Sequence, residues 1–329
     1  MKILITGGVG FVGGHLAVNL GQEGHTVDIL DNFQRGVKDA FIEEAMSKHG
    51  VKIISADLLD VGTLGSMCDD YTHIYHLAAI IGVAHVMRDP YQVLTDNVRM
   101  TENVILLARR QKALKRLLFS STSEVYAGTL LYMEMPIPTP EGTPIALTSL
   151  DHPRTSYMLS KLYGEAMCIN SGLPITIVRL HNVYGPRMGM SHVIPELLWK
   201  SWRSKDGDSL DLYNTDHKRT FCYIDDAVRM MRSVTELENG EGKTVNIGNE
   251  YPEITIGDLA KVVMEIVGRD LIILPQTGTM GSPSRRCPSV SVLRALTGMQ
   301  GQYTLKQGVS LTYSWYLETV FQGTGKTAQ

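Results

Sequence analysis

Short apolar runs alternate with amphipathic segments over the first 180 residues of the chain. Two segments, Phe11–Leu20 and Asn97–Leu107, carry apolar residues at helical spacing. Strands that alternate with helices predict βαβ units, and therefore an α/β fold with a doubly wound parallel sheet. The runs typical of buried strands are Ile3–Thr6, Val27–Leu30, Val51–Ser55, His73–Leu77, Leu117–Ser121 and Ile175–Leu180.

The alternation is less regular beyond residue 180. Thr255 and Asp258 form a capping pattern, which predicts a helix that carries Ile256, Leu259 and Val263. Ser310–Phe321 is a last amphipathic segment, and the polar residues 322–329 are expected to be a flexible tail.

A glycine-rich turn, TGGVGFVGG at residues 6–14, lies between the first predicted strand and the first predicted helix. The spacing of Gly7, Gly10 and Gly13 suits a tight turn, the approach of a pyrophosphate to the backbone, and close packing of helix on strand. Phe11 and Val12 begin the helix, whose unpaired N–H groups favour phosphate. The turn therefore predicts a dinucleotide site.

An acidic residue, Asp31, ends the second predicted strand about 20 residues after the turn, where a carboxylate binds ribose hydroxyls. No arginine replaces it to meet a 2′-phosphate, so NAD is favoured over NADP. Asn32 follows it, and Asp57 and Leu58 after the third strand are expected to flank the adenine. A tight turn in another α/β protein would need the glycines but not this combination.

Tyr157 and Lys161 are four residues apart and would share one face of a helix. A neighbouring ammonium and a positive nicotinamide both favour the phenolate form of tyrosine. Such a tyrosine takes a proton from a sugar hydroxyl while hydride leaves the same carbon. Without an NAD site, the same spacing would indicate only two neighbouring side chains on the surface of a helix.

A polar segment, Ser120–Tyr126, follows the fifth predicted strand. The carboxyl ends of strands in an open α/β sheet are where ligands bind, so this segment is a candidate for catalysis. Its Ser, Thr and Glu residues also suit a helix cap.

Composition excludes several classes of partner. The chain has 329 residues, 43% of them apolar, and a net charge of −3, so neither nucleic acid nor an anionic membrane is an expected partner. No apolar run approaches the ~20 residues of a membrane span, and the strand pattern starts too early for a signal peptide. The four cysteines lack metal-site spacing, so we expect no metal and a reducing, cytoplasmic compartment.

Five motifs occur in order: TGGVGFVG from Thr6, His76-Leu77-Ala78-Ala79, SSTSEVY at 120–126, the Tyr157/Lys161 pair, and NVYGPR from Asn182. Through them the chain resembles extended short-chain dehydrogenases/reductases of the sugar-nucleotide epimerase/dehydratase/decarboxylase type, from residue 1 to about residue 320.

The resemblance implies a Rossmann-type doubly wound parallel sheet with a smaller C-terminal α/β substrate-binding lobe. Residues 1–179 and about 218–250 would form the NAD-binding domain. Residues of about 180–217 and 251–321 would bind the nucleotide sugar, ahead of the 322–329 tail. The family also implies a homodimer that pairs through the Tyr157 helix and the helix near 95–110.

The resemblance implies roles for individual residues. Thr122 would hydrogen-bond the sugar C4 hydroxyl, Tyr157 would be the base, and Lys161 would tune it. NAD would contact both Tyr157 and Lys161. The other residues implied are catalytic Ser123 and Glu124, cofactor-binding Leu77, Ala78 and Ala79, and substrate-binding Asn182, Arg187, Arg219 and Arg286.

The reaction that follows C4 oxidation stays open. The triplet Thr122-Ser123-Glu124 resembles GDP-mannose 4,6-dehydratases and UDP-glucuronate decarboxylases, with Glu124 near sugar C5. Ser123 stands where other dehydratases have an acid, and Ala127 replaces a usual glycine. The alternatives are a 4-epimerase, an NAD(P)H-dependent keto-sugar reductase and a non-catalytic dinucleotide sensor.

Overall fold

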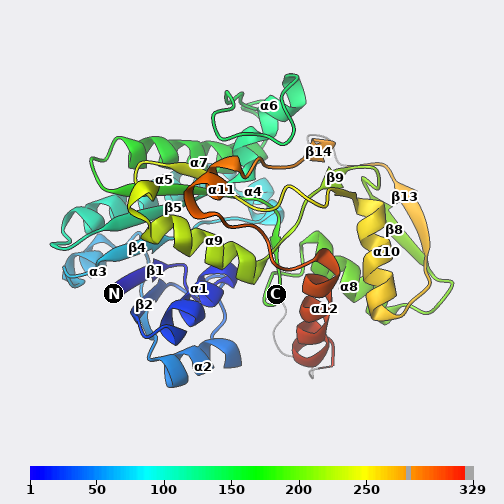
Figure 1. Cartoon of the computed structure of the whole chain (residues 1–329), viewed down its shortest axis with the longest axis horizontal. Coiled ribbons are helices and arrows are strands. Elements are labelled where there is room, and N and C mark those ends of the chain that lie inside the picture. The colour runs from blue at the N-terminus through cyan, green and yellow to red at the C-terminus, as the bar shows by residue number, and fades with distance from the viewer. Residues whose placement is uncertain (279–282, 323–329) are drawn as a thin grey trace.

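The computed structural model describes residues 1–278 and 283–322, so the predicted tail beyond Gln322 lies outside the described residues. A seven-stranded sheet with strand order β11-β6-β5-β4-β1-β2-β3 dominates the fold (Figure 1), and all its strand pairs are parallel. The α/β prediction is confirmed. Its strands are β1 (Lys2–Thr6), β2 (Thr26–Asp31), β3 (Lys52–Ser55), β4 (His73–His76), β5 (Arg116–Thr122), β6 (Ile175–Leu180) and β11 (Thr244–Ile247).

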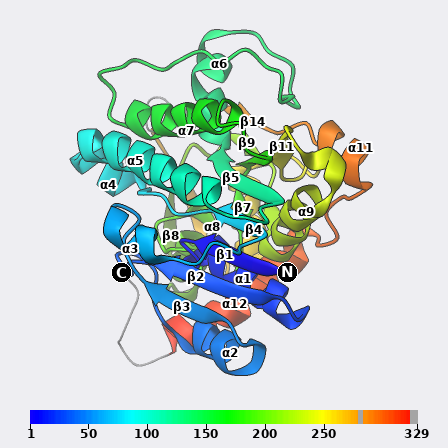
Figure 2. The same ribbon diagram turned by 90° about the vertical axis from the view of Figure 1, so that its left-hand side faces the viewer.

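Helices cover both faces of this sheet (Figure 2). Along β1, Ile3 and Ile5 belong to one core cluster and Leu4 to another, because successive strand side chains point to opposite faces. Burial on both faces is what a parallel sheet requires. The helices of this unit are α1 (Phe11–Gln22), α2 (Ala40–His49), α3 (Val61–Ser66), α4 (Val83–Arg88), α5 (Pro90–Arg109), α6 (Ala127–Tyr132), α7 (Arg154–Ile169) and α9 (Ile224–Glu236).

A smaller lobe is built from short sheets and helices at the C-terminal side of the large sheet. As predicted, Thr255 caps α10, accepting the Asp258 N–H at 3.0 Å. The last helix begins earlier than predicted because Thr304 and Gln307 form a capping box. The elements of this part include α8 (Val193–Arg203), β8 (Ser209–Tyr213), β9 (Lys218–Arg219), β12 (Ile254–Thr255), α10 (Ile256–Val267), β13 (Ile272–Gln276), β14 (Arg285–Arg286) and α12 (Leu305–Tyr316).

Shorter elements complete the fold. They are η1 (Ser123–Tyr126), β7 (Val183–Tyr184), β10 (Cys222–Tyr223), η2 (Glu238–Gly240), α11 (Ser291–Thr297) and η3 (Leu317–Phe321). In the described part of the chain, every helix is too short or too polar to cross a membrane.

A buried ion pair joins α7 to the sheet. Two nitrogens of Arg179 on β6 donate to the Glu165 carboxylate on α7, at 2.7 and 2.9 Å. Ser121 on β5 donates to the same carboxylate, and Arg179 also donates to the Tyr126 hydroxyl at 2.6 Å. Because Glu165 lies one helical turn beyond Lys161, this pair sets the position of α7 against the end of β5.

Removing Glu165 is expected to destabilise the fold strongly. A Glu165→Ala variant leaves the buried Arg179 guanidinium without its counter-charge, which costs about 3–5 kcal/mol. Urea unfolding measures the change. Glu44→Ala, which removes an exposed carboxylate paired with Lys48, is the control and should leave the midpoint almost unchanged. A Glu165→Ala midpoint as high as that of the control would contradict the assignment.

Candidate active site

The glycine turn packs against the backbone that follows β4. Gly7 has φ +70°, and a Cβ there would lie 2.8 Å from the Ala78 backbone. A Cβ on Gly13 would lie 2.3 Å from the Gly7 carbonyl oxygen. Gly10 precedes α1 without a side-chain cap, so the first N–H groups of the helix remain available to a diphosphate. This bare turn at a helix N-terminus fits a dinucleotide.

Adding a methyl group to the turn should remove the cofactor. We expect Gly13→Ala to lower NAD affinity about a hundredfold or more, because its Cβ collides with backbone and displaces the turn. NAD released from denatured, purified protein and quantified by chromatography measures this. Gly65→Ala is the matched control, since its added Cβ meets no atom within 4 Å. Equal NAD content in the two variants would refute the assignment of the turn.

Asp31 connects the glycine turn to the loop that follows β2. Its carboxylate accepts the N–H of Val9 at 3.0 Å and the N–H of Phe33 at 2.9 Å. Each carboxylate oxygen retains acceptor capacity, so ribose binding by Asp31 stays a prediction. Asn32 donates to Asp57 at 2.9 Å, which brings these two predicted cofactor residues together.

The other predicted cofactor residues differ in how far they are exposed. Leu58 is buried in a core cluster, so its side chain packs inside the fold. Leu77, Ala78 and Ala79 follow β4 and are partly exposed. The Ala78 N–H lies 3.4 Å from the Thr6 hydroxyl, which holds this segment beside the glycine turn.

The predicted catalytic residues meet where β5 ends against α7. The Lys161 ammonium donates to the Ser120 carbonyl at 2.8 Å and lies 6.0 Å from the centre of the Tyr157 ring. Burial lowers the pKa of Lys161 to about 8. Ser123, just after Thr122, is buried.

Tyr157 is held in its protonated form by its surroundings. Burial and the negative charge of Glu124 raise the pKa of Tyr157, whereas a hydrogen bond with Thr122 and the charge of Arg35 act to lower it. The phenolate form therefore needs further positive charge nearby, which a bound oxidised nicotinamide would supply.

Glu124 lies in a charged cluster that joins distant parts of the chain. Its carboxylate contacts Arg286 of β14 at 2.8 Å and Arg154 of α7 at 3.4 Å. Burial acts to raise the pKa of Glu124, but the charges of Arg286 and Arg154 outweigh it and hold the pKa below its usual value. The charge of Arg219 on β9 also acts to lower the pKa of Glu124. One carboxylate among three arginines leaves this cluster net positive.

Arg154, whose place before Tyr157 resembles both the dehydratases and the decarboxylases, received no site role from the sequence, but it joins this cluster. It begins α7 three residues before Tyr157, so both side chains lie on the same face of the helix. That spacing was the available signal, because side chains three residues apart on a helix lie close together.

Arg35 is a second missed residue. It lies four residues after Asp31 and donates to the Ile81 carbonyl at 3.0 Å, so it connects the loops that follow β2 and β4. Its positive charge acts to lower the pKa of Tyr157. The available signal was its position close after Asp31.

The predicted substrate residues fall into two places. Arg219 pairs with Arg286 across β9 and β14 at the smaller lobe, and Asn182 donates to the carbonyl of Thr220, the residue after Arg219, at 2.8 Å. Arg187 lies apart from them, because its side chain is 5% exposed and its guanidinium bonds to the glycine turn.

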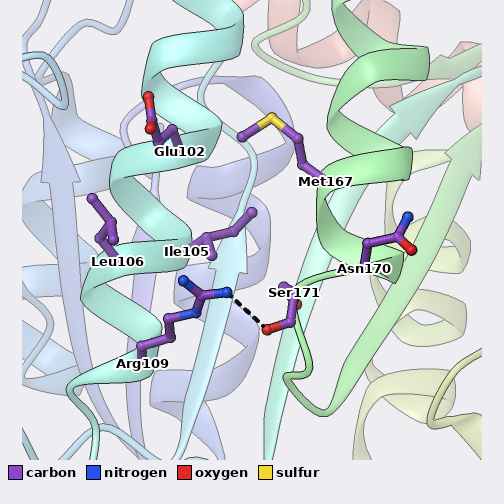
Figure 3. Close-up of a pocket in the computed structure, with 7 residues that line it drawn as sticks. All are labelled: Glu102, Ile105, Leu106, Arg109, Met167, Asn170 and Ser171. Atoms are coloured by element: carbon purple, nitrogen blue, oxygen red, sulfur yellow. Dashed lines mark hydrogen bonds between the residues drawn. The ribbon is translucent and has the colours of Figure 1, made fainter.

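A shallow pocket of about 210 Å³ lies between α5 and α7, away from these residues (Figure 3). Arg109 of α5 donates to the Ser171 carbonyl beyond α7 at 3.0 Å, and Met167 and Ile105 form its apolar part. None of the predicted catalytic residues lines it.

Known proteins are similar to this chain in both sequence and fold. A UDP-N-acetyl-alpha-D-glucosaminuronate decarboxylase from Bacillus cytotoxicus is 32% identical over 96% of this chain and 98% of its own length. A UDP-glucose 4-epimerase structure from Thermotoga maritima matches 97% of this chain and 99% of its own, with a TM-score of 0.82 and 24% identity. The enzyme WbmG of Bordetella bronchiseptica, in complex with NAD and UDP, matches 97% of this chain and 95% of its own, with a TM-score of 0.79 and 25% identity.

Residues 3–248 match the model of the NAD dependent epimerase/dehydratase family. The match covers the glycine turn, the Tyr157/Lys161 pair and the Glu124 region, so the cofactor expected from the sequence, NAD, is confirmed. This chain is therefore an NAD-dependent enzyme of the epimerase/dehydratase family.

Proposed function

We propose that this enzyme decarboxylates a UDP-linked hexuronate through transient oxidation at sugar C4. The observation that carries the proposal is the net positive cluster of Glu124, Arg154 and Arg286 beside Tyr157. A hexuronate differs from a neutral hexose by a C6 carboxylate, and arginine forks bind carboxylates with charge-assisted hydrogen bonds. The Bacillus cytotoxicus relative, named for a UDP-hexosaminuronate, supports the same substrate class.

The ionisation of Glu124 favours decarboxylation over dehydration. A 4,6-dehydratase needs a group that removes the C5 proton and then protonates the departing C6 hydroxyl, which works best with a pKa near the operating pH. Arg286 and Arg154 hold the pKa of Glu124 below its usual value, which makes it a poor choice for that task. Decarboxylation requires no base at C5.

The first step uses the residues at the end of β5 and on α7. Tyr157 takes the proton of the C4 hydroxyl, Thr122 orients that hydroxyl, and Lys161 adds positive charge near the phenolate. The glycine turn and Asp31 would hold NAD, which would supply the hydride acceptor for C4 and the hydride for the final reduction. The product of the first step is a C4 ketone placed β to the C6 carboxylate.

The second step breaks the C5–C6 bond. Its electron pair moves into the C4 carbonyl, carbon dioxide leaves, and the enolate oxygen remains beside Tyr157 and Thr122. C5 then takes a proton from water, and the ketone is reduced. Arg154 and Arg286 orient the carboxylate, while Glu124 competes for the same two arginines and prevents them from over-stabilising the ground state.

A panel of substrates tests the proposal. The purified enzyme is incubated with UDP-glucuronate, UDP-N-acetylglucosaminuronate and their neutral counterparts, and product masses are recorded. Loss of carbon dioxide from either uronate supports the proposal. Loss of water from a neutral sugar would show a dehydratase, and an isomer of unchanged mass a 4-epimerase; either result alone would overturn it.

The proposed function also assigns a ligand to each part of the fold. The large sheet unit, residues 1–179 and about 218–250, would hold NAD, and the smaller lobe would hold the nucleotide. We also propose a homodimer through α5 and α7, because Leu106, Tyr163 and Ile169 expose 47%, 59% and 57% of their surface there. Sedimentation velocity measures the oligomeric state, and a monomer at micromolar concentration would contradict the dimer.

A further inference from the structure

The Arg187 guanidinium bonds to the glycine turn and to the segment that precedes α2. Its two terminal nitrogens donate to the carbonyls of Val9 at 3.1 Å and Gly10 at 3.3 Å. A third bond reaches the Val37 carbonyl at 3.2 Å, and Nε donates to Asp39 at 2.8 Å. With its side chain 5% exposed, this guanidinium has its donors directed at the protein rather than at a substrate.

Neighbouring residues leave space for this guanidinium. A Cβ added to Gly14 would lie 2.4 Å from Arg187 Nη1, so only glycine leaves room there. The guanidinium carbon lies 5.0 Å from the centre of the Phe41 ring, a cation–π distance. His15 of α1 contacts the Pro186 carbonyl at 3.1 Å. Two distant segments, the turn with α1 and the start of α2, therefore converge on Arg187.

Arg187 belongs to the segment that enters the smaller lobe. It lies between β7, at the edge of the large unit, and α8, the first helix of the lobe. Its φ of +67° and that of Gly185, +156°, make a sharp bend in this segment. Asn182 begins the segment and is bonded to Thr220, beside Arg219 of the lobe. The segment therefore connects the smaller lobe to the guanidinium.

The contacts of Arg187 also affect how the turn meets a diphosphate. The carbonyls of Val9 and Gly10 belong to the same peptide units as the N–H groups of Gly10 and Phe11, so holding the carbonyls fixes the direction of those N–H groups.

We propose that Arg187 is a positioning residue that makes NAD binding and nucleotide-sugar binding mutually dependent. The identity of the second ligand rests on the proposed function, but the coupling itself does not. Binding in the smaller lobe fixes the 182–190 segment, Arg187 then holds the turn, and NAD binds more tightly. By linkage, NAD raises the affinity for the nucleotide by the same factor.

Equilibrium dialysis of purified holoenzyme against NAD, with and without a nucleoside diphosphate, measures the coupling. UDP is the main probe, with GDP, dTDP and CDP in parallel, and the one that binds is used. In the wild-type enzyme the NAD Kd should fall about tenfold when the diphosphate is present. In Arg187→Met the NAD Kd should rise and the diphosphate should no longer change it. Arg203→Gln, an exposed arginine of α8, is the control and should keep the wild-type factor.

Two results would overturn the inference. The first is a wild-type NAD Kd that none of the diphosphates changes. The second is an Arg187→Met enzyme that binds NAD more weakly but keeps the wild-type factor, because Arg187 would then be merely structural. If Arg187→Met is insoluble, Asp39→Asn tests the coupling instead. Asparagine keeps the α2 cap at the Ile42 N–H but weakens the ion pair with Arg187. It should show a reduced factor. None of these measurements requires decarboxylation, so failure of the proposed reaction remains a separate result.

Discussion

Tyr157→Phe should lower turnover about 10³-fold, because the variant has no phenolic proton acceptor for the C4 hydroxyl. Loss of one hydroxyl leaves the glycine turn and Asp31 in place, so the variant should keep its NAD. The lost group is also the one that Glu124 and burial hold protonated and that Thr122 contacts. Single-turnover reduction of bound NAD by substrate, followed by its absorbance, measures the step directly.

Tyr163→Phe is the matched control. It removes a hydroxyl from the same helix, at a side chain that is 59% exposed, and should retain full activity. If Tyr157→Phe still reduces bound NAD at the wild-type rate, another group removes the C4 proton and the catalytic assignment is wrong.

Arg286→Gln should lower kcat/KM for a UDP-hexuronate about 10³-fold, since truncating one member of a buried charge pair removes several kcal/mol of interaction. The variant should bind UDP itself as the wild type does, because we assign Arg286 to the C6 carboxylate. With Arg286 gone, Glu124 keeps only the longer contact to Arg154 at 3.4 Å and repels the substrate carboxylate.

Arg285→Gln provides the comparison. Arg285 is the neighbouring residue of β14, but it is 47% exposed and paired with Glu253, so its loss should change kcat/KM little. If Arg286→Gln weakens UDP and UDP-hexuronate equally, Arg286 grips the nucleotide, as the family resemblance implies, and the carboxylate assignment fails.

The large sheet was readable from sequence because its strands are continuous apolar runs that alternate with helices. β1, β2 and β6 each follow the predicted run within one or two residues. β11 was not predicted as a strand, because Thr244–Ile247 is short and its place depends on pairing with β6, about 65 residues earlier. Such pairing leaves no local pattern.

The same division holds for the site. The glycine turn and the Tyr157/Lys161 pair are local patterns, and their chemistry could be read from spacing. The contact between Glu124 and Arg286 spans 162 residues, so the sequence suggested each residue but not their ion pair. For Arg187, the family motif predicted a contact with the substrate. The side chain instead follows the bend of its backbone and bonds to the glycine turn.

The oxidation of the sugar and the selection of an acidic sugar depend on different elements of the fold. In the proposed mechanism, proton and hydride transfer depend on β5, α7 and the turn before α1, whereas the selection of an acidic sugar also depends on Arg286 of the two-residue strand β14. Substitutions on that strand can therefore redirect the product while the redox apparatus stays intact. An evolving lineage with this layout can acquire a new reaction without rebuilding its oxidation step.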